Sequence, residues 1–237
     1  LLGIEDESLR CVAECYLADD EFMERFAQAP AGIKHHHAYQ GGLLEHTVHL
    51  MELAAVVGPL YPDVHQELLL LGAFLHDLGK VDELGADRQL HYTDAGQLLG
   101  HVVLGASLLD QKIAAAEEML DDPFPVELAL RLKHMVLSHQ GEYEYGSPKL
   151  PMTMEAVALH MLDNLDAKLN GWGQLISEDV NIDSNWTPYF PNLGRKLFKP
   201  SMANASAATA PKPGRAEVAA AADDEVASSA AASNGPN

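Results

Sequence analysis

The chain has 237 residues, of which 47% are hydrophobic, and its formal net charge is −20. This length and composition predict one large globular domain, or one domain with a tail. Almost all of the negative charge lies in residues 1–200. Nucleic-acid binders usually present a basic face. So acidic a domain is therefore not expected to hold a long polyanion by charge alone.

Two cysteines and the start of the chain indicate the compartment. Cys11 and Cys15 lie one turn apart on an expected helix, where a disulfide is geometrically poor, so we expect reduced thiols, as in cytoplasmic proteins. We expect no apolar run long enough to span a bilayer, no signal peptide, and therefore no membrane partner. The chain begins with Leu1 rather than Met, so we expect a fragment or a processed chain.

Apolar residues recur at helical spacing along most of the chain, and we find no convincing strand alternation. Asp19 or Asp20 is an expected N-cap, and the segment Asp82–Leu98 is expected to be irregular. The expected helices cover residues 4–29 (as one or two helices), 43–57, 64–78, 100–120, 125–138 and 154–169. The predicted fold class is therefore all-α, a compact helical bundle.

The C-terminal part changes composition twice. After Gly171 the chain is expected to be irregular, with aromatic residues such as Trp172 and Trp186 strapping it back onto the bundle. From Ser201 the sequence is rich in Ala, Ser and Pro, which bury too little apolar surface to offset the entropy of ordering. The predicted organisation is an N-terminal helical segment (1–33), a central domain (34–172), a strap (173–200) and a disordered tail (201–237).

The adjacent pair His76-Asp77 is the strongest chemical signal in the chain. It follows the apolar run Leu68–Leu75. An aspartate is almost never fully buried unless it is paired or bound to a metal, because its desolvation is costly. Imidazole and carboxylate groups are ligands for divalent metals of intermediate hardness. The pair therefore predicts a cation or another partner in the interior.

Helical spacing places further candidate ligands on core-facing stripes. His46 shares a face with Leu50, and Asp163 shares one with Leu159. His139 likewise shares a face with Val136. A single histidine on an apolar face would be an ordinary core residue. Several such residues on separate helices, together with the adjacent pair, predict a common interior site.

The order His46, His76-Asp77 and Asp163 resembles the signature of the HD superfamily of metal-dependent phosphohydrolases. Longer strings resemble the HD domain of YhaM-type 3′-5′ exoribonucleases, over about residues 4–199. These strings are GGLLEHT at 41–47, HDLGK at 76–80, GHVVLG at 100–105, LSHQG at 137–141 and LDNLDAK at 162–168. The central domain, 34–172, is thereby interpreted as an HD domain.

The resemblance implies a metal centre and a role for each of its residues. The common metal set of the superfamily falls on His46, His76, Asp77 and Asp163, with Asp77 as the natural bridge if two ions bind and as a catalytic residue. The additional histidines of dinuclear members fall on His101 and His139. Two divalent ions are thus expected, drawn from manganese, iron, cobalt, nickel, zinc and magnesium. Some dinuclear relatives have a second histidine where this chain has Gln140, which leaves the second position open.

Lysines near the motifs are candidates for contacts to phosphate. Lys80 is a candidate catalytic residue that contacts a phosphate oxygen, with a solvated lysine at a helix end as an equal alternative. Lys149 and Lys168 are weaker candidates of the same kind. We expect Asp166 to be a surface carboxylate, with a role in orienting a metal ligand or as a general base as the less favoured alternatives. We expect His134 to be an ordinary helix histidine.

Residues before the first motif are candidates for substrate contact. Tyr39 offers a ring that can stack on a base, and His37 lies beside it in the sequence. A packing role is at least an equal alternative for both residues.

The resemblance implies a 3′-5′ exoribonuclease that acts on single-stranded RNA and releases nucleoside monophosphates. The family carries an N-terminal OB-fold that binds nucleic acid, and we expect that module to lie outside this chain, which shows no strand-rich region. Two alternatives stay open: a hydrolase of small nucleotides or cyclic dinucleotides, which the acidic composition favours, and a non-catalytic nucleotide-binding HD module. The oligomeric state is also left open.

Overall fold

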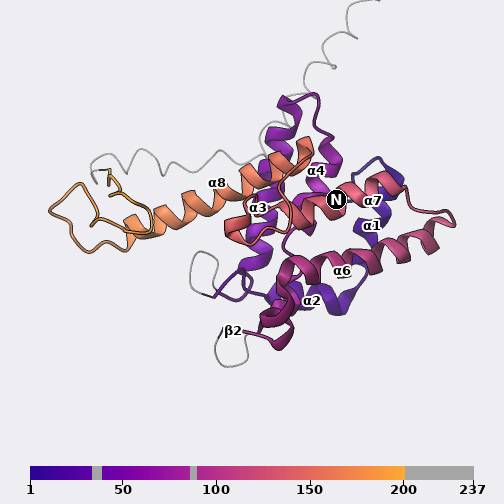
Figure 1. Ribbon diagram of the computed structural model, residues 1–237, viewed down its shortest axis with the longest axis horizontal. Coiled ribbons are helices and arrows are strands. Elements are labelled where there is room, and N and C mark those ends of the chain that lie inside the picture. The colour runs from indigo at the N-terminus through magenta and orange to yellow at the C-terminus, as the bar shows by residue number, and fades with distance from the viewer. Residues whose placement is uncertain (34–38, 86–89, 201–237) are drawn as a thin grey trace, which may run out of the picture. The chain divides into compact units, whose positions relative to one another are not determined.

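The computed structural model describes residues 1–33, 39–85 and 90–200 (Figure 1). It confirms the all-α prediction. The α-helices are α1 (Glu7–Leu17), α2 (Asp20–Gln28), α3 (Gly42–Val57), α4 (Gln66–Leu75), α5 (Lys80–Glu83), α6 (Asp94–Leu120), α7 (Val126–Ser138) and α8 (Met154–Ser177), with short 3-10 helices η1 (Gly58–Leu60) and η2 (Tyr143–Tyr145). The expected disordered tail and the candidate His37 lie outside the described residues.

The first two helices begin at aspartate caps. Asp6 accepts a hydrogen bond from the backbone N–H of Leu9, and Asp19 accepts one from Phe22. These side chains satisfy N–H groups that have no partner within the helix. Of the two caps expected for α2, Asp19 is therefore the one used. The cysteines of α1 are free thiols, as expected.

Helix α4 is the central element of the core and contacts α3, α7 and α8. Leu68, Leu69, Leu71 and Leu75 are all buried on it. The helix ends at Leu75, three residues before the expected end. His76 and Asp77 consequently lie in the turn that follows α4 and leads into α5, at the end of the most apolar helix of the bundle.

The segment Asp82–Leu98 is more ordered than expected. Two short antiparallel strands, β1 (Leu84–Gly85) and β2 (His91–Tyr92), pair within it, so the expectation of no strand was wrong at this point. Helix α6 then starts at Asp94, because the Thr93 hydroxyl accepts a hydrogen bond from the N–H of Gly96. Strands of two residues carry no alternation that a sequence pattern can reveal.

Helix α6 is broken at Gly100, whose φ of 76° and ψ of 157° are not helical. A residue with a side chain rarely adopts this positive φ, so glycine suits the position. The expected start of the helix near residue 100 therefore marks the beginning of its second part. By length and composition alone α6 is able to cross a membrane, contrary to the expectation of no such run. That property is weak support for a span, and α6 packs against α1, α5 and α7.

Helix α8 continues to Ser177, beyond the expected end at residue 169 and through Gly171 and Gly173. A glycine in a helix costs about 1 kcal/mol relative to alanine, so it weakens a helix without ending it. The described residues from Glu178 to Pro200 belong to a second compact unit. Within that unit Trp186 and Phe198 pair as a β-bridge with their rings 5.2 Å apart. That this segment straps onto the bundle stays a prediction.

A buried carboxylate at the start of α8 joins three elements of the bundle. Glu155 is 1% exposed. Its Oε1 accepts a hydrogen bond of 2.8 Å from the backbone N–H of His65, the cap of α4, and lies 2.9 Å from Arg131 of α7. Burial favours the neutral acid, but these two partners outweigh it and lower the pKa of Glu155.

Replacing Glu155 with glutamine is expected to lower the free energy of unfolding near pH 7 by about 2 kcal/mol, because Arg131 loses its buried counter-charge. Since folding lowers the pKa of Glu155, its carboxylate stabilises the fold above the ordinary pKa of 4.5, and this contribution is lost as the pH falls through the folded-state pKa. Urea unfolding across this range measures the effect, with the exposed Glu127→Gln as control. A difference that does not shrink in acid would contradict the prediction.

Candidate metal centre

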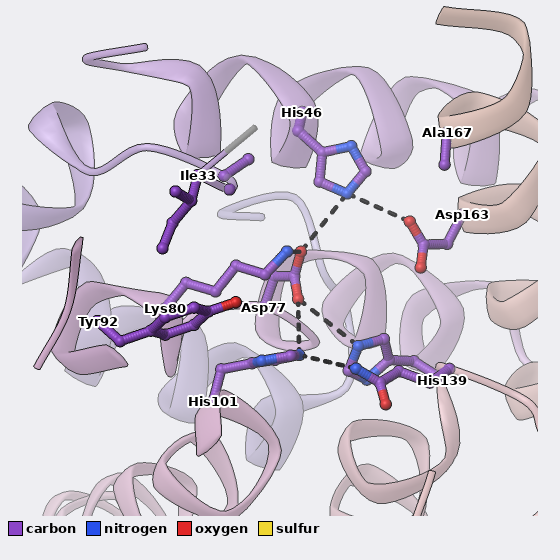
Figure 2. A pocket seen from close by; sticks show the side chains of 12 residues that line it. Ile33, His46, Asp77, Lys80, Tyr92, His101, His139, Asp163 and Ala167 are labelled. Carbon is purple, nitrogen blue, oxygen red and sulfur yellow. Dashed lines mark hydrogen bonds and ion pairs between the residues drawn. The ribbon is translucent and has the colours of Figure 1, made fainter. Parts of the chain in front are cut away.

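Five separate segments bring the expected ligands together, and all of these residues except His76 line one pocket (Figure 2). They are His46 on α3, His76 and Asp77 in the turn after α4, His101 on α6, His139 at the end of α7, and Asp163 on α8. His46, His76, Asp77 and His139 are buried, and the other two are half-buried. The pocket has a volume of about 590 Å³. The residues that the sequence predicts as ligands thus lie close together, and their roles as ligands stay predictions.

Asp77 lies between two groups of histidines. Figure 2 shows it with His46 on one side and with His101 and His139 on the other. Asp77 Oδ2 is 3.7 Å from His46 Nε2 and 3.3 Å from His76 Nε2. Asp77 Oδ1 is 3.5 Å from the Nε2 atoms of both His101 and His139. The two oxygens of one carboxylate therefore face two different clusters.

The other acidic candidate belongs to the first cluster. Asp163 Oδ1 is 3.3 Å from His46 Nε2, and His46 Nε2 is in turn 3.2 Å from His76 Nε2. We name His46, His76, Asp77 and Asp163 the first cluster, and Asp77, His101 and His139 the second cluster. Asp77 is the residue that both share.

The residues fit a divalent metal ion. Asp77 Oδ1 is buried and has no hydrogen-bond partner among the described residues, an arrangement that is costly unless a cation compensates it. In each of two groups, His46 with His76 and Asp77, and Asp77 with His101 and His139, the ligand atoms lie within 4.8 Å of one another. Imidazole nitrogen and carboxylate oxygen suit divalent ions of intermediate hardness.

Two of the histidines are oriented by backbone carbonyl groups. His76 Nδ1 lies 2.8 Å from the carbonyl oxygen of Ala73, and His139 Nδ1 lies 2.8 Å from that of Val136. A carbonyl oxygen only accepts hydrogen bonds, so each Nδ1 carries the proton and donates it. The Nε2 lone pair of both rings is therefore available to a metal ion.

Charges near Asp77 keep it ionised. Burial favours the neutral acid, but the Lys80 ammonium and the His76 ring hold the pKa of Asp77 well below its ordinary value. Lys80 Nζ donates a hydrogen bond of 2.6 Å to Asp77 Oδ2, and the Lys80 side chain is only 18% exposed. Lys80 is therefore a member of the pocket wall rather than a solvated lysine, while its contact to phosphate stays a prediction.

The pKa values of two histidines of the centre are shifted in opposite directions. Burial disfavours the charged form of His46, but hydrogen bonds to Asp163 and Asp166 outweigh it and raise its pKa to about 9. Burial favours the neutral form of Asp163, but its hydrogen bond with His46 outweighs this effect and lowers the pKa of Asp163 to about 2. Burial lowers the pKa of His139 to about 4, against the attraction of Asp77. His139 is thus held as the neutral imidazole that a metal requires.

The expectation that Asp166 is a surface carboxylate was wrong. Asp166 is 2% exposed, and its Oδ2 lies 3.0 Å from His46 Nδ1. A second carboxylate, Glu83, is buried 3.1 Å from His101 Nδ1 and was missed. Asp166 follows Asp163 by one helical turn, which gave a local signal. Glu83 lies in the segment that was expected to be irregular, so no periodicity marked it.

Two further residues at the pocket were not predicted as site residues. Tyr92 of β2 and Gln140 line the pocket, and Figure 2 shows Tyr92 on the same side as Lys80. Gln140 Nε2 lies 3.3 Å from His101 Nε2, so the residue that replaces a second histidine still faces the second cluster. Its position directly after His139 is the signal that marks it.

Three candidate substrate residues do not line the pocket. Tyr39 is exposed and donates a hydrogen bond to Glu45, and Lys149 and Lys168 are exposed. Their contacts to substrate stay predictions. His134 accepts a hydrogen bond of 2.9 Å from the N–H of Met152, a local role that agrees with an ordinary helix histidine.

Residues 43–168 match the HD domain family, and this range is more than half of the chain. The chain therefore belongs to the HD domain family, whose members bind divalent metals. No solved structure matches it.

Curated relatives share the name 3′-5′ exoribonuclease YhaM. Those of Bacillus subtilis (strain 168), Bacillus licheniformis and Bacillus pumilus are 46%, 46% and 41% identical to this chain over 176, 181 and 182 residues, respectively. These alignments cover 74%, 76% and 76% of this chain and 54%, 55% and 55% of the relatives. The chain thus spans about half the length of the curated relatives it matches.

Proposed function

We propose that this chain is the catalytic domain of a metal-dependent 3′-5′ exoribonuclease that hydrolyses single-stranded RNA and releases nucleoside monophosphates. The observation that carries the proposal is Asp77, a buried carboxylate shared by two histidine clusters at the base of a pocket. The identity of 41–46% to proteins named 3′-5′ exoribonuclease YhaM supports RNA as the substrate.

The proposed centre holds two ions, one in each cluster. His46, His76, Asp77 and Asp163 hold the first ion, and Asp77, His101 and His139 hold the second. The imidazole-rich set favours manganese, iron, cobalt or nickel over magnesium, which prefers oxygen ligands. Such ions, when bound, lower the pKa of a water molecule and offset charge on phosphoryl oxygens.

The residues of the chain then bind and orient the substrate. Lys80 is held in the pocket wall by Asp77 and supplies a positive charge at the position where a phosphate enters. The exposed ring of Tyr92, at the pocket, offers a face on which the terminal base stacks.

The pocket dimensions suit the removal of one nucleotide at a time. A volume of about 590 Å³ lies in the range of small-ligand sites. The net charge of −20 does not attract a long polyanion, so a separate nucleic-acid-binding module, as the resemblance implies, would hold the rest of the RNA.

The two cysteines are free thiols, as is usual in a reducing compartment. The protein is therefore proposed to act in the cytoplasm.

The same acidity supports a second candidate function, hydrolysis of small nucleotides or cyclic dinucleotides. Such substrates fill a pocket of this size and need no basic track. The two functions differ in the dependence of rate on polymer length.

A time course on a 5′-labelled single-stranded RNA oligomer with added Mn²⁺ tests the proposal. The expected result is a ladder that shortens from the 3′ end and is lost when the 3′ end is blocked. An intact oligomer, together with turnover of mononucleotides or cyclic dinucleotides in the same preparation, would establish the second candidate instead.

Replacing His101 with alanine is expected to remove the second ion and keep the first, because His101 contributes only to the second cluster. Metal content after dialysis against Mn²⁺, and a calorimetric titration, should show a stoichiometry reduced by about one ion. The control is His134→Ala, a half-buried histidine outside the centre, which should bind as the unmodified chain does. Loss of both ions, or of neither, in His101→Ala would show that the assignment to two clusters is wrong.

A further inference from the structure

Two buried carboxylates outside the proposed ligand set contact histidines of the centre from behind. Asp166 on α8 is 2% exposed and Glu83 at the end of α5 is 7% exposed. Asp166 approaches His46 of the first cluster, and Glu83 approaches His101 of the second. Each cluster therefore has one carboxylate behind one of its histidines.

Asp166 fixes the ring of His46. Its Oδ2 lies 3.0 Å from His46 Nδ1, and a carboxylate at neutral pH only accepts hydrogen bonds, so Nδ1 carries a proton there. The opposite atom, Nε2, is the one that faces Asp77 and Asp163. Asp166 is itself held by two further donors, His49 Nδ1 at 2.6 Å and Asn170 Nδ2 at 2.9 Å from its Oδ1.

Glu83 fixes His101 at two points. Its Oε1 accepts a hydrogen bond of 2.9 Å from the backbone N–H of His101 and lies 3.1 Å from His101 Nδ1. Gly96 permits this approach, because a Cβ there would lie 2.3 Å from the carbonyl oxygen of Glu83. His101 Nε2 consequently points toward Asp77 Oδ1.

The other two histidines are oriented differently. His76 and His139 donate to the neutral carbonyl groups of Ala73 and Val136. A carboxylate partner both orients an imidazole and increases its strength as a ligand, and removing such a partner typically costs about 10–100-fold in metal affinity. The negatively charged partners thus serve one histidine in each cluster.

We propose that Asp166 and Glu83 are positioning residues, one for each half of the centre: Asp166 holds His46 for the first ion, and Glu83 holds His101 for the second. The inference rests on the metal centre of the proposed function but not on its RNA substrate. It assigns to each cluster a separate carboxylate, so the affinities of the two halves can be lowered one at a time.

The test measures Co²⁺ binding to the full chain in two backgrounds, by visible absorption and by competition with a chelator. His101→Ala leaves the first cluster, and His46→Ala leaves the second. Asp166→Asn is expected to weaken Co²⁺ binding about 10–100-fold in the His101→Ala background, and Glu83→Gln to do so in the His46→Ala background. Each is expected to have no measurable effect in the opposite background.

A control separates positioning from stability. Asn170→Ala removes another donor to Asp166 but leaves the bond between Asp166 and His46, so Co²⁺ affinity should be unchanged even if the thermal midpoint without metal falls. Affinity that follows the midpoint in Asp166→Asn and Asn170→Ala alike would overturn the proposal. If Asp166→Asn does not fold, Asp166→Glu keeps the charge and displaces the acceptor, and unchanged affinity in that variant would overturn it as well.

The outcome is independent of the substrate. A chain that binds Co²⁺ with this dependence but leaves RNA intact would support the inference and reject the exoribonuclease function. A chain that binds no Co²⁺ in either background would reject the metal centre, and the positioning roles with it.

Discussion

Replacing Asp77 with alanine is expected to lower the rate of phosphodiester hydrolysis by more than about 10³-fold, because the ions of such centres supply several kcal/mol of transition-state stabilisation. Both clusters lose a ligand in this variant, since the two oxygens of Asp77 face different histidines. Lys80 also loses its partner at 2.6 Å and becomes a cation without a buried counter-charge. One substitution therefore disturbs metal binding, charge and phosphate contact together.

The measurement is initial rate on labelled RNA, together with metal content, for Asp77→Ala and for a matched control. The control is Asp82→Ala, an exposed carboxylate whose partner is Arg25, because surface ion pairs of this kind contribute about 0–1 kcal/mol. Asp82→Ala should retain both metal and rate. Full activity in Asp77→Ala would reject the metal-dependent mechanism.

Replacing Gly79 with alanine is expected to have the largest effect on the architecture of the site. A Cβ at this position would lie 2.0 Å from the carbonyl oxygen of His101 and 2.5 Å from the backbone N of Gly105. Both are backbone atoms of α6, so the strain is relieved only if α6 moves away from the turn that carries Asp77. We expect a loss of about 3 kcal/mol in the free energy of unfolding and weaker binding of the second ion.

Denaturant unfolding and a Mn²⁺ titration measure the two effects. Gly173→Ala is the matched control, because, apart from its chain neighbours and the adjacent backbone of α8, no atom of the described residues lies within 4 Å of a Cβ at that position. There the substitution should be neutral or stabilising by up to about 1 kcal/mol. Wild-type stability and unchanged metal binding in Gly79→Ala would show that α5 and α6 do not need this close approach.

Local chemistry in the sequence predicts much of the fold and of the candidate ligand set. Capping by Asp19 or Asp20 and apolar periodicity give the start of α2 and the bounds of α3 and α7 close to those observed. The core-facing stripes of His46, His139 and Asp163 place these residues correctly in one interior region, since a helical face is fixed by spacing alone. The pair His76-Asp77 can be predicted as a candidate site from the apolar run that precedes it alone.

What the sequence does not reveal depends on contacts between distant segments. Asp166 is buried where it pairs with His46, 120 residues away in the sequence. Glu83 contacts His101, which follows it in the sequence after both short strands. Neither contact leaves a periodic pattern. Gly171 was misjudged for a different reason: helix propensity penalises a glycine by an amount that the rest of α8 outweighs.

The break at Gly100 separates a short first part of α6 from a longer second part that carries His101. The first part of α6, before the break, has Leu98 82% and Leu99 55% exposed, so little apolar burial opposes its local unfolding. It follows directly on Tyr92, whereas His101 belongs to the longer second part, anchored by buried Leu109 and Ile113. Sub-global opening should therefore need less free energy on the tyrosine side than on the histidine side. In the proposed function, the edge at Tyr92 is therefore expected to open to solvent while the proposed ligand His101 keeps its geometry.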